Sequence, residues 1–336
     1  MERERSTIKM VARDAGVSQA TVSRVLNQPN LVKPETRDAV YAAMAENNYV
    51  PPAAARPPAE KQGVIGLALH DVRLAVAAEV IRALSTEFTE HGFNLMLINT
   101  CGERNVARFF RDHSSYRRTI DGLIAFSMKL DEEGASFFHS LDLPIVLMQS
   151  RCPSVRSIST NNYLGGRDAT EYLLSRGYHH IAFVGWDEDD ERVQARLAGY
   201  RSAIAGCRGS GSQEIIERDS LSEAGGHAAT LRIFEPRESG RPVPDAVFYA
   251  CDTMAVGGLR FFRERRIAIP EAVGVVGFDD ISIAPVVGLT TMQQFFHEKA
   301  RLARTYLERR ISGRDDHLGT DELSVTPRIM VRETTR

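Results

Sequence analysis

A short polar surface near the N-terminus carries side chains that can read DNA bases. Gln19, Ala20 and Arg24 fall on one face of a predicted helix, and no acid lies among them. In the major groove a glutamine can pair with adenine, an arginine with guanine, and an alanine can meet a thymine methyl group. Neighbouring hydroxyl and amide side chains suit phosphates, which position a helix without reading sequence. The candidate DNA contacts are Thr7, Ser18, Gln19, Ala20, Thr21, Ser23, Arg24 and Asn27.

The residues around this surface predict two short helices joined by a tight turn. Ile8, Val11 and Ala12 recur at helical spacing and so share one apolar face. Gly16 supplies the positive φ that a tight turn requires, and Ser18 has the chemistry of an N-cap. Two such helices form a helix-turn-helix. Any short hairpin of two helices with a polar face shares this pattern, so periodicity alone leaves DNA binding and a plain hairpin about equally supported.

The identities of these residues indicate DNA binding more specifically than their periodicity does. Residues 7–27, TIKMVARDAGVSQATVSRVLN, closely resemble the opening of the lactose/galactose-repressor (LacI/GalR) family of bacterial transcription regulators. The similarity continues along essentially the whole chain, and it implies that Gln19, Ala20 and Arg24 read bases. Met10 stands where the family usually has Asp, so Thr7 lacks a capping-box partner and the first helix is expected to fray slightly.

A third helix and a linker follow. The helix is expected from about Pro34 to Asn47, with Val40, Met44 and Tyr41 closing a small core. Residues 51–63, PPAAARPPAEKQG, have the composition of a linker.

The resemblance implies a hinge in this linker that becomes helical on the operator and inserts a leucine into the minor groove. Its candidate residues are Ala53, Ala54, Arg56 and Pro58. Proline disfavours a helix at the preceding residue, so Pro57 and Pro58 predict weaker operator bending here than in typical relatives.

From Gly63 onward, strands alternate with helices. Near-continuous apolar strands such as GVIGLALH and VGVVGFDD predict parallel sheets covered on both faces. Two such sets of strands predict two doubly wound subdomains, and the resemblance implies a sensor like a periplasmic sugar-binding protein, with a cleft between two lobes. The fold class is therefore an all-α helix-turn-helix head plus an α/β sensor. One helix of the first lobe is expected near Val106 to Tyr116.

The expected domains follow from these changes of pattern. The helix-turn-helix head takes residues 1–50, the hinge linker 51–62 and the sensor 63–336. The first lobe comprises about 63–160 and 292–320, and the second about 161–291 and 321–336, so the chain crosses near 160, 291 and 321.

Ligands bind outside the carboxyl ends of the strands in such folds, which favours polar residues at those ends. Asp279 follows a strand, where it is either a ligand contact or a turn residue. Arg196 lies on an amphipathic helix, where most arginines are solvated. The resemblance assigns both to the effector, because Arg196 precedes Gly199 and Tyr200 as the family arginine does. The effector candidates are His70, Asp71, Ser127, Gln149, Trp186, Arg196, Leu221, Cys251 and Asp279.

Composition argues against metal and membrane functions. The cysteines at 101, 152, 207 and 251 lack metal-ligand spacing, and adjacent His179 and His180 would point to opposite faces of a strand. We therefore expect no metal site and no cofactor. The charged start MERERSTIK has no apolar signal region, and no apolar run could span a membrane. A cytoplasmic protein associated with the bacterial nucleoid is expected.

Charge favours a dimer. Residues 1–61 contain nine Lys or Arg and seven Asp or Glu, so 9 − 7 gives a net charge of +2. One such head attracts phosphates only modestly, whereas two copies on one duplex would bind better. Because no apolar heptads trail the last segment, a coiled-coil tetramer is not expected.

These patterns predict a sequence-specific DNA-binding repressor. Its partners are operator DNA, a second copy of the chain and a small-molecule effector, a sugar or sugar derivative, bound between the lobes. The alternatives are a stand-alone solute-binding protein and an α/β-fold enzyme. The attached helix-turn-helix argues against the first, and the absence of a GxGxxG strand–helix turn or a P-loop argues against the second.

Overall fold

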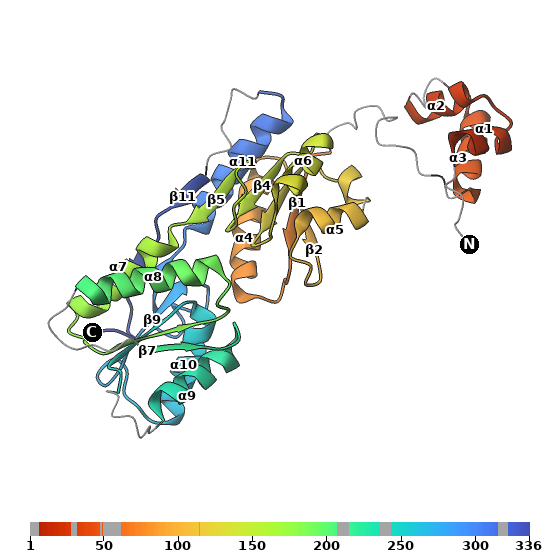
Figure 1. Cartoon of the computed structure of the whole chain (residues 1–336). Helices are drawn as coiled ribbons and strands as arrows, with labels where there is room; N and C mark the ends of the chain where they lie inside the picture. The colour runs from red at the N-terminus through yellow and green to blue at the C-terminus, as the bar shows by residue number, and fades with distance from the viewer. Residues whose placement is uncertain are drawn as a thin grey trace. The chain divides into compact units, whose positions relative to one another are not determined.

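The computed structural model describes residues 7–27, 32–47, 49, 62–113, 115–206, 215–235, 243–314 and 322–336. The chain divides into two units, Met1–Gln62 and Gly63–Arg336 (Figure 1). The predicted hinge residues Ala53, Ala54, Arg56 and Pro58 lie outside the described residues, as do Cys207 and the side chain of Asn27.

The described residues of the first unit form three short helices around a small apolar core. They are α1 (Ile8–Asp14), α2 (Gln19–Asn27) and α3 (Pro34–Glu46). Val11, Val22, Val25 and Val40 are fully buried between them. Tyr41 is 44% exposed, so its predicted place in this core was wrong. It follows Val40 directly and therefore points away from the face that Val40 buries.

The turn between α1 and α2 has the predicted chemistry. Gly16 has a φ of 66°, in the left-handed region that favours glycine. The hydroxyl of Ser18 accepts a hydrogen bond from the backbone N–H of Thr21 at 3.0 Å, which caps α2. Thr7 makes no such side-chain bond to α1.

The second unit contains two six-stranded sheets, one in each lobe. The first sheet has the order β11-β5-β4-β3-β1-β2 and the second has the order β12-β10-β9-β8-β6-β7. The strands of the first are β1 (Val64–Leu69), β2 (Asn94–Asn99), β3 (Gly122–Phe126), β4 (Ile145–Met148), β5 (Ser157–Thr160) and β11 (Glu322–Val325). Those of the second are β6 (Ile181–Gly185), β7 (Ile215–Arg218), β8 (Ala246–Tyr249), β9 (Gly274–Asp279), β10 (Thr290–Gln293) and β12 (Arg328–Met330).

Most described strand pairs are parallel, as their apolar sequences predict, because helices cover both faces. The pair of β10 and β12 is antiparallel. The central strands β3, β6 and β8 are buried along their whole length, whereas the edge strand β11 alternates between exposed and half-buried residues.

The helices cover these sheets from both sides (Figure 1). In the first lobe, α4 and α11 pack on one face of the sheet, and α5 and α6 pack on the other. The bounds are α4 (Ala75–Glu90), α5 (Val106–Asp112), α6 (Glu132–Ser140), α7 (Asn162–Ser175), α8 (Glu191–Gly206), α9 (Glu223–Phe234), α10 (Asp252–Glu264) and α11 (Phe296–Ile311). The helix predicted to reach Tyr116 ends at Asp112, and a separate 3-10 turn covers Tyr116–Arg118.

The third crossing between the lobes differs from its predicted position. Strand β10 pairs with β9 in the second sheet, so the second crossing follows Gln293, close to the expected position near 291. Strand β11 pairs with β5 in the first sheet, so the third crossing lies between Val325 and Arg328 and not near 321. The half-exposed sequence ELSV fits the edge of either sheet. Only its pairing with β5 in the folded protein assigns this strand to the first sheet.

Helices α7 and α8 approach until their backbones touch. A Cβ placed on Gly199 would lie 2.1 Å from the carbonyl oxygen of Tyr163, and one on Gly166 would lie 2.1 Å from that of Arg196. Glycine is therefore required at these crossings, and the contact fixes the helix that carries Arg196.

We expect Gly199→Ala to destabilise the second unit by about 1–3 kcal/mol, because the added methyl group forces two backbones apart. Calorimetric unfolding of the full chain measures this loss. Gly206→Ala is the matched control on the same helix, since nothing lies within 4 Å of its added Cβ. Equal unfolding midpoints for the two variants would contradict the close contact.

Candidate functional site

Helix α2 presents its predicted reading face to solvent. Gln19, Ala20 and Arg24 are exposed, while Val22 and Val25 on the opposite face are buried. Such a short helix with a polar outer face can enter a major groove.

The predicted phosphate-binding hydroxyls lie beside this face. Thr7 and Ser18 are exposed, and Thr21 and Ser23 are half-buried. The Ser18 and Thr21 hydroxyl oxygens are 2.9 Å apart.

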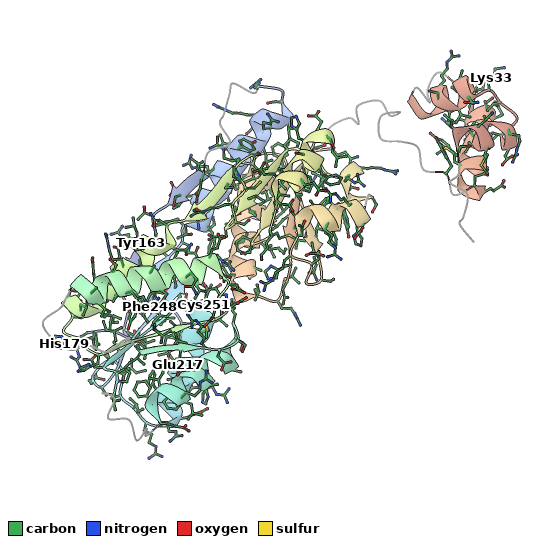
Figure 2. The ribbon with its side chains drawn as sticks, in the orientation of Figure 1. Lys33, Tyr163, His179, Glu217, Phe248 and Cys251 are labelled. Carbon is green, nitrogen blue, oxygen red and sulfur yellow. The ribbon has the colours of Figure 1, made fainter. Side chains whose placement is uncertain are left out.

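All nine effector candidates line one cavity of about 240 Å³ in the second unit. They are His70, Asp71, Ser127, Gln149, Trp186, Arg196, Leu221, Cys251 and Asp279. Figure 2 labels one of them, Cys251, near the meeting of the two lobes.

Three strand ends aim polar side chains into this cavity through left-handed backbone. Ser127 after β3 has a φ of 54°, Gln149 after β4 has 68°, and Asp279 at the end of β9 has 125°. Such conformations cost energy for residues other than glycine, and they gather at ligand sites. A second cavity of about 720 Å³ adjoins the first and shares Ser127 and Gln149 with it.

Arg196 is a buried cation at the floor of the cavity, with 2% of its surface exposed. Its Nε donates to Asn162 Oδ1 at 2.8 Å, and its Nη1 donates to the carbonyl oxygen of Ala250. The guanidinium lies 3.6 Å from the centre of the Phe278 ring, a cation–π contact. Burial lowers the pKa of Arg196 below its ordinary value.

Asp279 faces this cation. Its Oδ1 lies 3.8 Å from Arg196 Nη1 and accepts a hydrogen bond from Gln294 Nε2. Burial raises the pKa of Asp279 to about 6, although Arg196 and Gln294 favour the ionised form.

Gln294 extends the network into the first lobe. Its Oε1 accepts hydrogen bonds from Gln149, from the hydroxyl of Thr160 and from Lys299 Nζ at 3.3 Å. Lys299 is fully buried. Burial, together with the charge of Arg196, lowers the pKa of Lys299 well below its ordinary value. Polar groups of both lobes therefore meet in one buried network behind the cavity.

Asp190 and Arg192 also line the cavity, and the sequence interpretation missed them. Two side-chain hydrogen bonds join them, from Arg192 Nε to Asp190 Oδ1 at 2.9 Å and from Nη2 to Oδ2 at 2.6 Å, and the backbone N–H of Arg192 donates to Oδ1 at 3.0 Å. Trp186 Nε1 donates to Asp190 Oδ2 at 3.1 Å. Burial acts to raise the pKa of Asp190, but the hydrogen bonds and charge of Arg192 outweigh it and lower the pKa.

Arg104 and Gln294 are further cavity residues that were missed. Asp190 and Arg192 follow strand β6, so the rule of carboxyl strand ends could have found them. Gln294 follows β10 in the same way. Arg104 lies in the loop after the carboxyl end of β2, so the same rule marks it.

Two neighbouring acids have structural roles. Asp280, next to Asp279, pairs with Arg332 at 2.6 Å. Asp252 is fully buried, and it accepts hydrogen bonds from Thr291 and from the backbone N–H of Ile281 at 3.0 Å. Burial, followed by the charge of Asp279, raises the pKa of Asp252 to about 8.

The part of the chain that the structure describes contains no group of three His, Cys, Asp or Glu side chains placed to hold a metal ion. The backbone N–H groups of His179 and His180 donate to Asp245 at 2.8 Å each. No helix within the described ranges is long and apolar enough to cross a membrane.

Comparison with known proteins places both units. Residues 7–52 match the bacterial regulatory proteins of the lacI family, and residues 170–335 match the periplasmic binding protein-like domain. The chain is 31% identical to the HTH-type transcriptional repressor PurR of Vibrio atlanticus (strain LGP32), over 98% of this chain and 99% of that protein.

Two solved structures share the architecture. A lac repressor dimer bound to operator and the anti-inducer ONPF is 26% identical with a TM-score of 0.67, over 98% of each chain. The transcriptional regulator CelR–cellobiose complex is 26% identical with a TM-score of 0.65, over 98% of this chain and 99% of that one.

The buried carboxyl of Asp252 predicts a pH dependence of stability. Its pKa of about 8 in the folded protein exceeds its ordinary value, so the folded state holds a proton that the unfolded state releases. This stability is fully present at acid pH and is lost as the pH rises towards 8.

We therefore compare the free energy of unfolding of Asp252→Asn with that of the unsubstituted chain. Between pH 5.5 and pH 8.5, we expect this difference to shift in favour of the variant by at least about 1 kcal/mol. Urea unfolding across that range measures the difference. Asp142→Asn, at an exposed turn, should give a curve parallel to that of the unsubstituted chain. A parallel curve for Asp252→Asn would mean that this carboxyl is ionised in the fold.

Proposed function

The chain belongs to the lacI family of bacterial regulatory proteins, and we propose that the residues singled out above are its operator and effector contacts. It is a sequence-specific DNA-binding repressor, not an enzyme, and a small-molecule effector controls its operator affinity. Neither alternative, the stand-alone solute-binding protein or the α/β-fold enzyme, describes a chain of this family.

The proposed operator contacts lie on α2. Arg24 and Gln19 pair with bases through the major groove, and Ala20 meets a thymine methyl group. Thr7, Ser18, Thr21 and Ser23 bind phosphates and set the register of the helix. Asn27 belongs to this set through its place in the sequence, as Ala53, Ala54, Arg56 and Pro58 belong to the hinge. The protein acts as a homodimer on operator sites in the cytoplasm, at the bacterial nucleoid.

The proposed effector site is the cavity between the lobes. One observation carries the assignment, namely that nine residues spread from position 70 to position 279 line a single cavity. At its polar floor, Arg196 donates to ligand hydroxyl groups and Asp279 accepts from them. Trp186 and Leu221 form apolar walls. Ser127 and Gln149 line the cavity from the other lobe. A sugar or sugar derivative offers the hydroxyls and apolar ring faces that this lining fits.

Control of the operator follows from lobe closure. An effector that contacts Ser127 in one lobe and Asp279 in the other favours one relative position of the lobes. The change in operator affinity is limited by the difference between the effector's affinities for the two lobe arrangements. By the same coupling, bound operator DNA changes the effector affinity by an equal factor.

Arg24→Ala tests the operator assignment. We expect the preference for operator over unrelated DNA to fall by about 1–3 kcal/mol, because one base-reading pair is lost. A gel shift on the DNA upstream of the protein's own gene, with an unrelated competitor, measures that preference. Arg13→Ala, which removes an exposed arginine of α1, should weaken binding to all DNA alike. An unchanged preference in Arg24→Ala would remove Arg24 from the reading surface.

Asp279→Asn tests the effector site. The amide cannot replace a carboxylate that accepts from ligand hydroxyls beside Arg196, so release or tightening of the operator on adding ligand should be lost. Binding to operator without ligand should persist, because the substitution lies in the other unit. Asp280→Asn is the adjacent control and should keep the response. A normal ligand response in Asp279→Asn would show that the effector binds elsewhere.

A further inference from the structure

One contact between the two lobes lies outside the effector cavity. Glu79 of α4, in the first lobe, accepts a hydrogen bond from the backbone N–H of Ser282 at 2.8 Å and another from the Ser282 hydroxyl. Ser282 follows β9, so it belongs to the second lobe. Arg82 Nη1 lies 2.9 Å from Glu79 Oε2, and its Nη2 donates to the Ser282 hydroxyl at 3.1 Å. We call Glu79, Arg82 and Ser282 the outer contact, because none of the three lines the 240 Å³ cavity.

The chemistry of the outer contact distinguishes it from an ordinary pair of surface side chains. The Glu79 side chain is only 13% exposed, so solvent screens its charge less than that of an open surface pair. A carboxylate that accepts from a backbone N–H forms a charge-assisted hydrogen bond, roughly twice as strong as a neutral one. The contact therefore favours the arrangement of the lobes in which it forms.

A fixed turn joins Ser282 to the effector site. Ser282 lies three residues after Asp279, which lines the cavity. Asp279 and Asp280 have φ values of 125° and 55°, in the left-handed region that persists only where surrounding structure holds it. The backbone N–H of Ile281 donates to the buried carboxyl of Asp252 at 3.0 Å. A displacement of Asp279 is therefore passed on to Ser282.

Helix α4 joins the other side of the outer contact to the same cavity. Ala75 and Val76 line the cavity in the first turn of α4, and Glu79 follows about one turn later. Inside the cavity, Arg192 donates to Ser127 of the opposite lobe, and a bound ligand competes with that bond. The outer contact joins two elements of the effector site at a place that the ligand does not occupy.

We propose that the outer contact is a regulatory latch, which sets how much of the ligand-free protein adopts this lobe arrangement and thereby sets its basal operator affinity. This inference rests on the proposed control of the operator by lobe position. A bond between lobes shifts the balance of two arrangements by the difference in its own free energy between them. Because its residues lie outside the cavity lining, the latch adjusts operator affinity without changing the groups that recognise the effector.

Hydrogen exchange of the full-length, ligand-free protein tests the outer contact at single amides. The N–H of Ser282 has its acceptor in the first lobe, whereas the N–H of Ile281 bonds to Asp252 within the second. We expect Glu79→Ala to speed the exchange of the Ser282 amide about 10- to 100-fold and to leave that of Ile281 unchanged. Unchanged exchange at Ser282 would overturn the inference. Faster exchange at both amides would also count against it, because the whole turn would then be opening.

Two further variants of α4 separate the latch from a general loss of charge. Glu87→Ala removes a carboxylate of the same helix whose partner Arg304, at 2.7 Å, lies in the first lobe as well. Its Ser282 amide should exchange as in the unsubstituted chain. Glu79→Gln keeps an oxygen acceptor without the charge, so it should retain part of the protection of Ser282. If Glu87→Ala speeds this exchange as much as Glu79→Ala does, the effect belongs to the helix and the latch is excluded.

Operator binding tests the regulatory role. A gel shift without ligand, on the DNA upstream of the protein's own gene, compares Glu79→Ala with Glu87→Ala. We expect Glu79→Ala to change operator affinity about 2- to 30-fold and Glu87→Ala to leave it unchanged. A fall would identify the latched arrangement as the stronger operator binder, and a rise would identify it as the weaker one; either supports the latch. Unchanged affinity despite faster exchange at Ser282 would overturn the regulatory role.

The latch and the effector site fail separately in these experiments, because the latch is tested without ligand. If Asp279→Asn keeps a normal ligand response while Glu79→Ala changes basal operator affinity, the latch stands and the effector assignment falls. If Asp279→Asn loses the response while Glu79→Ala behaves as Glu87→Ala does, the effector site stands and the latch falls.

Discussion

The buried pair of Arg196 and Asp279 is the constraint on which the sensor depends. A charge placed in the interior costs several kcal/mol unless partners satisfy it, so both groups need an environment built for them. Asn162, the carbonyl of Ala250 and the Phe278 ring hold the arginine. Gln294 holds the aspartate. The close glycine crossing of α7 and α8 then fixes the helix that carries Arg196.

This network lies where the chain passes between the lobes, and that position gives it mechanical importance. Gln294 follows β10 of the second sheet, and it bonds with Gln149 and Thr160 of the first. Lys299 begins the helix that returns to the first lobe and closes the same network. If the lobes change position, these buried polar groups must therefore exchange their hydrogen-bond partners. Since half-satisfied buried networks are costly, the lobes favour a few discrete arrangements over continuous sliding.

The sequence allowed the outline of this site to be predicted because its parts obey local rules. Asp279 and Gln149 end apolar strands, and Arg196 stands in a stretch that resembles a known family. Other residues obey no local rule. Lys299, in an amphipathic helix rich in arginine, has the pattern of a solvated residue, and it is buried only because the crossing segment supplies partners. Strand β11 has no apolar run that assigns it to a sheet, so the lobe boundary could not be placed from the sequence.

Arg192 shows why loops near strand ends decide specificity more than strands do. The family resemblance covers Arg196, four residues further along the same helix face, and gives it a place. Arg192 lies one turn earlier and donates to Ser127 of the opposite lobe, while Asp190, which Trp186 holds, accepts from its guanidinium. A substitution in that turn would change the charge of the cavity while leaving the hydrogen bonds of Arg196 to Asn162 and Ala250 in place. The fold can therefore keep one mechanism of lobe coupling while the groups at the cavity entrance select different effectors.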